Sequence, residues 1–294
     1  MPKEKARLMM LWIFLPAFNE ANTLPSLLTK IGNFGGRFSG PYRIVIVDDG
    51  STDNTSEVAM EFAGRMPIDV VRHEINRGLG ETERDGFEYV AERCSPEDIL
   101  VRLDADDTHE PEYILKLIEK IWEGYDVVNT SRFQAGGSQV GVSTYRAFVS
   151  LCANKFMKLI FNISGIRDYS CGFRAYRGQV LKDCVSVFGN GFIQLKGLGF
   201  TSTLETLVKL NLLGCKFAEV PFVLRYDQKR SQSKMVSSVT TLGYLMMAIL
   251  YHWPFGGWRV FYRELRNEYA RDREQAVTRF HWKTASRSAL HKIG

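Results

Sequence analysis

Hydrophobic residues follow two alternating patterns over the first 133 residues of the chain. Short hydrophobic runs of strand character lie at 8–15, 42–51, 68–74, 98–106 and 125–133. The longer segments between them have hydrophobic residues at every third or fourth position, as helices do, and lie at 20–34, 54–66, 80–94 and 111–124. Strands that alternate with helices predict right-handed βαβ units. We therefore expect an α/β fold, with a mostly parallel central sheet and helices on both faces.

Polar clusters follow four of the predicted strands directly. They read PAFNE after the first strand, DDGSTD after the second, NRGLG after the third and DADD after the fourth. The carboxyl ends of parallel strands meet at one edge of a sheet, and open α/β sheets bind their ligands there. Four polar loops at one edge predict a binding site.

The DADD cluster brings three carboxylates, Asp104, Asp106 and Asp107, within four positions. Such carboxylates at the end of a strand suit Mg²⁺ or Mn²⁺, held through one or two of them while phosphate oxygens complete the shell. The alternative is a solvated acidic turn that caps the helix beginning at Pro111. The three neighbouring polar loops favour the metal interpretation.

Several ligand classes lack their motifs in this chain. No Gly-x-Gly-x-x-Gly follows the first strand, which argues against a dinucleotide, and no P-loop is present. A sugar-1-phosphate nucleotidyltransferase would carry a glycine- and arginine-rich loop where PAFNEANTL stands. A non-enzymatic nucleotide-sugar binder would not need both the carboxylate pair and the basic segment near residue 230.

Composition adds few further limits. The chain has 294 residues, 45% hydrophobic and 24% charged, as in ordinary globular proteins. Its five cysteines include no Cys-x-x-Cys, which favours a reducing compartment over a disulfide framework or a zinc site. The five histidines show no ligand spacing, and we assign them no role. The first 18 residues imitate a signal peptide, but they fit a buried first strand better.

The ordered motifs LPAFNEANTL, VIVDDGSTDNT, NRGLGETERDGF, VRLDADDTHEPEYI, VNTSRF and DYSCGFRAYR resemble the inverting family 2 glycosyltransferases with the GT-A fold. Among these, the chain is most similar to the dolichol-phosphate and polyprenyl-phosphate sugar synthases, whose acceptor loop resembles VPFVLRYDQKRSQSKM. The resemblance covers about residues 10–235. It implies a catalytic domain at 1–234 and leaves 235–294 as a helical, aromatic and basic extension.

The resemblance also implies roles for single residues. Asp104 and Asp106 would bind the metal, with Asp106 the more direct ligand. The glycines of NRGLG would let the backbone approach the nucleotide closely. The residues implied to bind the nucleotide sugar are Pro16, Phe18, Glu20, Asp48, Asp49, Gly78, Gly80, Asp104 and Arg174. Those implied to take part in catalysis are Asp106, Arg132, Arg230 and Lys234. Thr108 departs from the family pattern, which has a glutamine there to complete the metal shell.

The implied reaction moves a sugar from a nucleotide-diphosphate sugar, such as GDP-mannose or a UDP-sugar, to a polyprenyl or dolichyl phosphate. An acceptor phosphate is already ionised near neutral pH and needs no general base. It needs cations instead, which Arg132, Arg225, Arg230 and Lys234 would supply. The alternative acceptor is a saccharide hydroxyl, which needs a carboxylate base. Glu205 is the candidate for that base, unless it pairs with Lys209 on a helix face.

Residues 235–258 contain no Asp, Glu, Lys or Arg. Within and after this segment Tyr251, Trp253, Trp258 and Tyr262 lie beside Arg259, Arg263 and Arg266. Aromatic rings with cations suit the headgroup layer of a membrane. We expect a helix that lies on the cytoplasmic face of a membrane, with no nucleic acid as partner. The alternative is a helix packed on the core of the catalytic domain.

Overall fold

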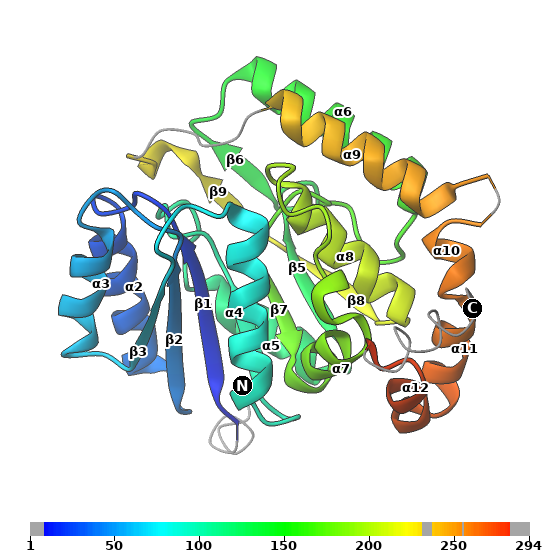
Figure 1. The fold of residues 1–294 in the computed structure, drawn as a ribbon. Coiled ribbons are helices and arrows are strands. Elements are labelled where there is room, and N and C mark those ends of the chain that lie inside the picture. Colours follow the sequence, from blue (N-terminus) through cyan, green and yellow to red (C-terminus); the bar gives the residue numbers. More distant parts are fainter. Residues whose placement is uncertain (1–8, 231–236, 255, 283–294) are drawn as a thin grey trace.

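The computed structural model describes residues 9–230, 237–254 and 256–282. Its centre is a seven-stranded sheet with helices on both faces (Figure 1). The order across the sheet is β3-β2-β1-β4-β7-β5-β8. The bounds of these strands are β1 (Leu11–Ala17), β2 (Tyr42–Asp48), β3 (Ile68–Arg72), β4 (Ile99–Arg102), β5 (Val127–Ser131), β7 (Arg174–Arg177) and β8 (Phe217–Pro221).

Neighbouring strands of this sheet run parallel except at β7, which is antiparallel to both β4 and β5. The predicted mostly parallel sheet is therefore confirmed. The reversal of β7 has a consequence for the site, because it pairs Arg174 with Arg102 in register. The CGFR segment at the start of β7 thus begins beside the end of β4, where the DADD turn starts.

Both faces of the sheet are buried, as a parallel sheet requires. Along β1, Trp12 and Phe14 enter one core while Leu11, Ile13 and Leu15 enter the other. The first core also receives α4, α7 and α8, and the second receives α2, α3 and α5. These helices are α2 (Leu24–Arg37), α3 (Thr55–Ala63), α4 (Leu79–Arg93), α5 (Tyr113–Trp122), α7 (Gly178–Phe188) and α8 (Thr201–Leu213).

Helix α4 lies very close to the sheet. A Cβ added at Gly86 would stand 2.2 Å from the Phe14 ring, so only glycine fits there. Phe87 then packs edge-on against Phe14, with ring centroids 5.7 Å apart. This packing fixes the height of α4 over β1 and, with it, the NRGLG loop that precedes the helix.

A second, small sheet lies above the carboxyl edge of the first (Figure 1). It pairs β6 (Ser138–Val140) with β9 (Val223–Arg225), in parallel. The short 3-10 helix η2 (Tyr226–Gln228) follows β9. The Arg225 backbone N–H donates to the Thr108 carbonyl at 3.0 Å, which ties the segment 223–230 to the turn that contains the acidic cluster.

The described part of the C-terminal extension is helical, as expected. It consists of α9 (Ser237–His252), α10 (Trp258–Phe261), α11 (Arg263–Arg271) and α12 (Arg273–Arg279). Met247, Tyr251, Leu265 and Ala276 are buried in the same core as α4, α7 and α8. The boundary expected at residue 234 stays a prediction, but these helices share a core with the domain that precedes them.

Candidate active site

The four polar loops meet at the carboxyl edge of the sheet, and hydrogen bonds join them. Asn19 donates its backbone N–H to the Ser51 hydroxyl at 2.8 Å, and Glu20 donates to the Thr55 hydroxyl at 2.8 Å. Thr23 donates its hydroxyl to the Glu20 carboxylate at 2.6 Å and also lies 3.3 Å from the Ala105 carbonyl. The loop after β1 therefore contacts both the DDGSTD loop and the DADD turn.

The two aspartates of the second loop have different surroundings. Asp48 is fully buried and accepts hydrogen bonds from the Ser51 backbone at 3.1 Å and from the Ser56 hydroxyl. It therefore holds the turn that leads into α3. Asp49 accepts the backbone N–H groups of Arg77 and Gly78, at 2.8 and 2.9 Å. Asp49 thus fixes the position of the NRGLG loop.

His73 contacts the carboxylate of Asp49. Its Nδ1 lies 2.8 Å from the Asp49 carboxylate and its Nε2 lies 3.1 Å from Asp85. The imidazole is buried between these two carboxylates. The sequence gives no sign of this role, because His73 is a single residue at the end of β3 with no ligand spacing. It is a positioning residue for Asp49.

The first carboxylate of the DADD turn lies beside a buried arginine. Asp104 is 2.6 Å from the guanidinium of Arg102, which is also 2.9 Å from Glu83. Burial alone would raise the pKa of Asp104, but the positive charge of Arg102 holds it below its usual value. Gly172 makes room for this arginine, since an added Cβ would stand 2.0 Å from the guanidinium. Gly172 of the CGFR motif therefore leaves space for the guanidinium that pairs with Asp104.

His109 lies beneath the same turn. The Asp104 backbone N–H donates to its Nδ1 at 3.2 Å, so this nitrogen is an acceptor and carries no proton. The ring stacks on Phe173 at 5.2 Å between centroids, and burial lowers the pKa of the imidazole. A neutral His109 thus orients the backbone of Asp104.

Asp106 has a partner for each carboxylate oxygen. Oδ1 accepts the Thr108 hydroxyl at 2.6 Å and the Thr108 backbone N–H at 3.2 Å. Oδ2 forms an ion pair with the ammonium of Lys229, from the segment after η2. Thr108 stands where the family pattern has a metal-binding glutamine. Its hydroxyl instead donates to Asp106 and fixes the orientation of that carboxylate.

The role of Asp104 and Asp106 as ligands of a divalent cation stays a prediction. Among the described residues, no group of three or more His, Cys, Asp or Glu side chains is arranged to hold a metal. The described part of the chain therefore offers the two predicted carboxylates and not a full cage. Mg²⁺ and Mn²⁺ fit such a site, because they commonly keep one or two carboxylates and take their remaining ligands from substrate phosphates and water.

Arg132 is held at the neighbouring strand end by a buried carboxylate. Its Nε and Nη2 donate to the two oxygens of Asp168, at 2.7 and 2.8 Å, and Nη2 also donates to the Ser170 hydroxyl at 2.7 Å. Burial alone would raise the pKa of Asp168, but Arg132 holds it below its usual value. This pair joins the SRF and DYSCGFR motifs across the edge of the sheet.

Residues 12–185 match the family described as glycosyl transferase family 2. The chain belongs to this family. A dolichol-phosphate mannosyltransferase of Pyrococcus furiosus is 32% identical over 224 residues, which are 76% of this chain and 58% of that protein. An undecaprenyl-phosphate mannosyltransferase of Micrococcus luteus is 30% identical over 76% of this chain and 87% of its own length. The matched region thus spans less than two thirds of the Pyrococcus protein.

The fold of this family 2 glycosyltransferase is the expected GT-A fold. Glucosyl-3-phosphoglycerate synthase of Mycobacterium tuberculosis, solved with Mn²⁺ and UDP, superposes with a TM-score of 0.55. The likeness covers 83% of this chain and 79% of that one, at 18% sequence identity. At this identity the likeness concerns the fold alone.

The Arg174 guanidinium is hydrogen-bonded within the protein. It is buried and donates to Asn129 at 2.6 Å, to the Thr203 carbonyl at 2.6 Å and to the Tyr169 carbonyl at 3.2 Å. All of these partners lie within the protein. Arg174 thus ties β5 and β7 to α8, and its implied role in nucleotide-sugar binding stays a prediction.

The two glycines of NRGLG, Gly78 and Gly80, have different surroundings. Gly78 opens α4 with a φ of +87°, a conformation that glycine adopts without strain. At Gly80, an added Cβ would stand 2.6 Å from the Cα of Lys196. The protein backbone before α8 therefore approaches Gly80 closely, and the implied approach of a nucleotide to these glycines stays a prediction.

Pro16, Phe18 and Glu20 lie where the resemblance places the nucleoside pocket, and their ligand contacts stay predictions. Pro16 pairs with Val47 at the end of β1. Phe18 is half-buried, and Glu20 is buried with the Thr23 hydroxyl on its carboxylate. Glu20 thus supports the first loop from inside.

The predicted acceptor cations are only partly brought together. Arg230 is exposed next to Lys229, whereas Lys234 lies outside the described residues. Arg225 pairs with Asp227 at 2.8 Å, which is a local structural ion pair. Among the described residues of this segment, Lys229 is the cation that pairs with Asp106. It stands inside the polar run YDQKRSQSKM, where no spacing distinguishes it from its basic neighbours.

Glu205 and Lys209 are both buried in α8. The Glu205 carboxylate accepts the backbone N–H groups of Gln194 and Leu195, each at 2.9 Å. Burial raises its pKa. These two hydrogen bonds fix the segment before α8. Glu205 therefore has backbone partners inside the protein, where the sequence had suggested a pairing with Lys209 on a helix face.

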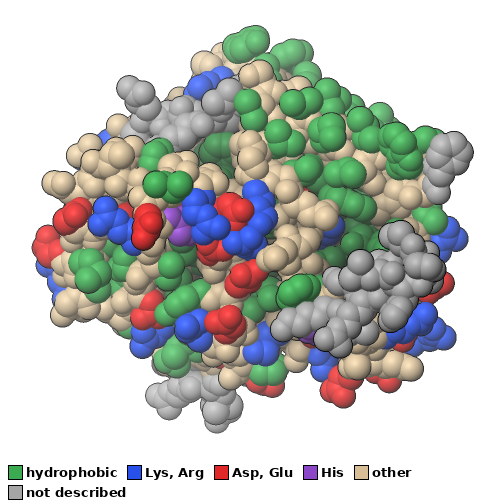
Figure 2. Space-filling view, viewed as in Figure 1, with side chains coloured by type: hydrophobic (Ala, Val, Ile, Leu, Met, Phe, Trp, Pro, Cys, Tyr) green, Lys and Arg blue, Asp and Glu red, His purple; other side chains and the backbone are tan. Residues whose placement is uncertain are grey.

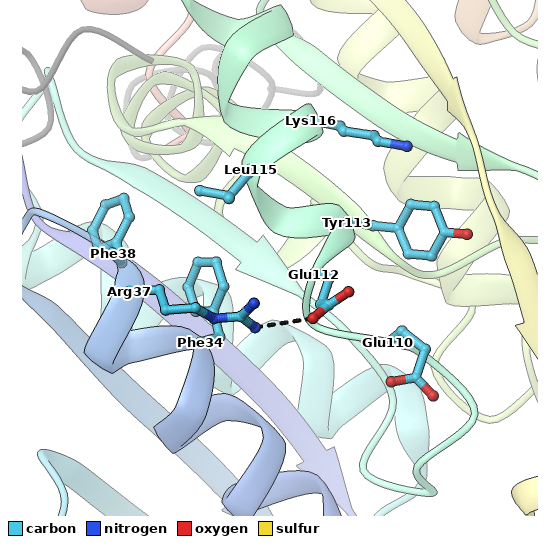
Figure 3. Close-up of a pocket in the computed structure, with 8 residues that line it drawn as sticks. All are labelled: Phe34, Arg37, Phe38, Glu110, Glu112, Tyr113, Leu115 and Lys116. Atoms are coloured by element: carbon cyan, nitrogen blue, oxygen red, sulfur yellow. Dashed lines mark hydrogen bonds and ion pairs between the residues drawn. The ribbon is translucent and has the colours of Figure 1, made fainter.

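A surface cavity of about 460 Å³ lies between α2 and α5 (Figure 3). Phe34 and Leu115 line it, and Arg37 and Glu112 close one side through an ion pair of 2.9 Å. None of the four polar loops at the sheet edge contributes its predicted nucleotide-binding residues to this cavity. We therefore do not place the donor there.

Proposed function

We propose that this glycosyltransferase moves a sugar from a nucleotide-diphosphate sugar to a polyprenyl phosphate, with Mg²⁺ or Mn²⁺ on Asp104 and Asp106. One observation carries the proposal. The carboxylate expected to bind the donor's metal, Asp106, is in contact with Lys229 of the segment expected to bind the acceptor. The residues proposed to bind the donor and those proposed to bind the acceptor therefore meet where Asp106 contacts Lys229.

The donor side consists of the acidic turn and its supports. A divalent cation between these carboxylates and the diphosphate would stabilise the negative charge of the departing nucleoside diphosphate. Arg102 and His109 fix the side chain and backbone of Asp104, and Thr108 fixes Asp106. This turn is therefore preorganised before any ligand arrives, which is the arrangement that electrostatic stabilisation requires.

The acceptor side consists of cations. An ionised lipid phosphate attacks the anomeric carbon without losing a proton, so it needs no base. It must approach a second phosphate group, and positive charge offsets that repulsion. Lys229 and Arg230 lie after η2, and Arg132 is fixed on Asp168. Lys234, outside the described residues, belongs to the same proposal.

Transfer to a saccharide hydroxyl is the alternative, and it is less well supported. It would need a general base, and Glu205 was the candidate from the sequence. The carboxylate of Glu205 is fully buried and accepts two backbone N–H groups. It is therefore not placed to take a proton from an acceptor.

The surface of the protein supports a lipid acceptor. Helices α6 (Thr144–Phe161) and α9 lie side by side along one edge of the molecule (Figure 1). Their outward side chains form an apolar face, and Figure 2 shows hydrophobic side chains gathered over this region. We call it the α6/α9 face; its exposed hydrophobic residues are Tyr145, Phe148, Val149, Leu151, Phe156, Leu159, Leu242, Leu245, Met246 and Ile249.

Scattered exposed hydrophobic residues are ordinary, but a contiguous face of them marks an interaction surface. Leu159 is 81% exposed and Phe148 is 64% exposed on α6. Exposed Arg146, Lys155 and Lys158 lie on the same helix. Apolar side chains with cations suit a helix pair lying in the interface of an anionic membrane. No helix among the described residues is long and apolar enough to span a bilayer.

Three of the four aromatic residues expected at the membrane pack against other parts of the protein. Tyr251 is buried against Phe161, and Trp258 and Tyr262 pack around Lys209. Of the four aromatics expected at the interface, Trp253 is exposed, at 54%. The proposed membrane contact therefore shifts from residues 251–262 to the α6/α9 face, which the structure builds from two segments far apart in sequence.

The names of the relatives support the acceptor class. Two of them, quoted above, are named for transfer of mannose to a lipid phosphate, and a further relative from Shewanella sediminis is an undecaprenyl-phosphate 4-deoxy-4-formamido-L-arabinose transferase. The sugars differ while the lipid phosphate recurs. The synthase of Mycobacterium tuberculosis, which resembles this chain in fold, was solved with Mn²⁺.

The test is a donor screen. Radiolabelled GDP-mannose and UDP-sugars are each incubated with polyprenyl phosphate in detergent and Mg²⁺ or Mn²⁺, and the label is followed into the organic phase. We expect one donor class to give lipid-bound label. No lipid-bound label with any donor, while saccharide acceptors are labelled, would favour the alternative.

A further inference from the structure

We propose that the Lys229 ammonium occupies the cation position of Asp106 while no metal is bound, so that a divalent cation must displace it. This inference rests on the proposed metal role of Asp106. In this inference the metal and the Lys229 ammonium compete for Asp106, so that metal binding on the donor side releases a lysine on the acceptor side.

The contact itself is specific. The Lys229 ammonium pairs with Asp106 Oδ2, while Thr108 takes Oδ1 through two hydrogen bonds. The two side chains are only 12% and 13% exposed, so the pair is largely shielded from water. A metal bound through Oδ2 would stand where the ammonium now is.

The charge of the pair supports the competition. The Lys229 ammonium forms an ion pair with the Asp106 carboxylate, and both side chains are largely shielded from water. Two cations on one carboxylate oxygen repel each other strongly in a shielded site. Metal and ammonium thus exclude each other.

The segment that carries Lys229 has other attachments to the turn. Lys30 donates to the Gln228 side chain at 2.7 Å and pairs with Asp107 at 2.9 Å. The backbone of Arg225 is bonded to Thr108. Displacement of Lys229 therefore leaves its neighbours in place and frees one ammonium group beside the acidic turn. There it can meet a phosphate group of the acceptor.

The experiment measures metal affinity, not activity. Mn²⁺ is titrated into the full-length protein without nucleotide, and free Mn²⁺ is followed by electron paramagnetic resonance. Lys229→Met keeps the length of the side chain and removes its charge. We expect Mn²⁺ to bind Lys229→Met more tightly than wild type by at least ~3-fold, the low end for releasing one partly buried ion pair.

Two further variants separate competition from local charge and from misfolding. Arg230→Gln removes the same charge from an exposed neighbour and should leave Mn²⁺ affinity within error of wild type. Lys229→Arg restores a cation and should restore the weaker affinity. Equal or weaker Mn²⁺ binding by Lys229→Met overturns the inference, as does an equal gain in Arg230→Gln.

Asp106→Asn distinguishes this inference from the function beneath it. If Asp106→Asn loses Mn²⁺ binding while Lys229→Met gains none, the inference falls and the metal role of Asp106 stands. If Asp106→Asn binds Mn²⁺ like wild type, even with GDP or UDP present, the metal lies elsewhere and both fall.

Discussion

The indole ring of Trp258 lies over the ammonium of Lys209, with 3.7 Å from Nζ to the ring centroid. Phe188 and Tyr262 stand at 5.3 Å around the same ammonium, which also donates to Gln194 at 3.2 Å. An aromatic residue of the extension thus covers a buried charge of α8. Cation–π contact of this kind stabilises a desolvated ammonium, and here it fastens α10 to the catalytic domain.

The first prediction concerns stability and pH. Burial lowers the pKa of Lys209 to about 8, against about 10.4 in an unfolded chain. The unfolded state therefore binds this proton more tightly, and the stability linked to Lys209 is complete above about pH 10.4 and is lost as pH falls through about 8. Relative to Lys209→Met, wild type should gain about 2 kcal/mol of unfolding free energy between about pH 7.5 and 9.5.

Urea unfolding of both proteins at the two pH values measures this difference. Lys116→Met, which changes an exposed lysine on α5, serves as the control and should show no such dependence. A Lys209→Met difference that does not change with pH would mean that Lys209 is not a desolvated ammonium.

The second prediction concerns Asp106. Asp106→Ala removes the proposed metal ligand and should lower turnover by at least ~10²-fold, the scale of losing one electrostatic stabiliser. The variant should still fold, because Asp106 belongs to neither hydrophobic core, and its circular dichroism spectrum should match that of wild type. Asp227→Asn, which changes another carboxylate near Lys229, should retain most activity. Full activity of Asp106→Ala in EDTA would remove the metal from the mechanism.

The third prediction concerns the acceptor phosphate. Arg230→Ala and Lys234→Ala should raise the KM for polyprenyl phosphate and leave the Kd of the nucleotide sugar nearly unchanged, because these cations are proposed to meet the acceptor only. Initial rates and calorimetry measure the two quantities. Lys116→Ala should change neither. Parallel losses of donor and acceptor binding would assign these cations to the donor diphosphate.

The fourth prediction concerns the membrane. Phe148→Glu with Leu159→Glu places two charges on the α6/α9 face and should reduce flotation with anionic vesicles. Met60→Glu alters a residue of α3 that is 62% exposed, and it should float like wild type. Truncation before α9 is a poor test, because Met247 and Tyr251 belong to the core. If wild type stays with the soluble fraction at low salt, the face binds something other than lipid.

The parts of the fold that the sequence predicts are those with a periodic signal. Leu11, Ile13 and Leu15 alternate with Trp12 and Phe14, and two cores receive them accordingly. The polar loops are also predictable, because each follows a strand directly. The reversed direction of β7 has no such signal, since pairing with β4 and β5 depends on residues far away in the chain.

Single side chains of the site were harder to predict, because burial decides their roles. Arg132 and Arg174 stand in comparable motifs, yet Arg132 lies at the edge of the sheet on Asp168, while Arg174 is enclosed by carbonyl groups. Lys229 and His73 carry no spacing that marks them. Their partners, Asp106 and Asp49, lie 123 and 24 positions away, so only the folded chain brings them together.

The chemical bond in the product decides whether the acceptor is a lipid phosphate. Wild-type protein is incubated with its donor, polyprenyl phosphate and Mg²⁺ or Mn²⁺, and the lipid product is examined by ³¹P NMR and mass spectrometry. We expect a phosphodiester between the sugar and the polyprenyl phosphate, formed in equal amount to the nucleoside diphosphate released. Free sugar in the aqueous phase, or a glycosidic bond to a hydroxyl group with the lipid phosphate unchanged, would contradict the proposed function.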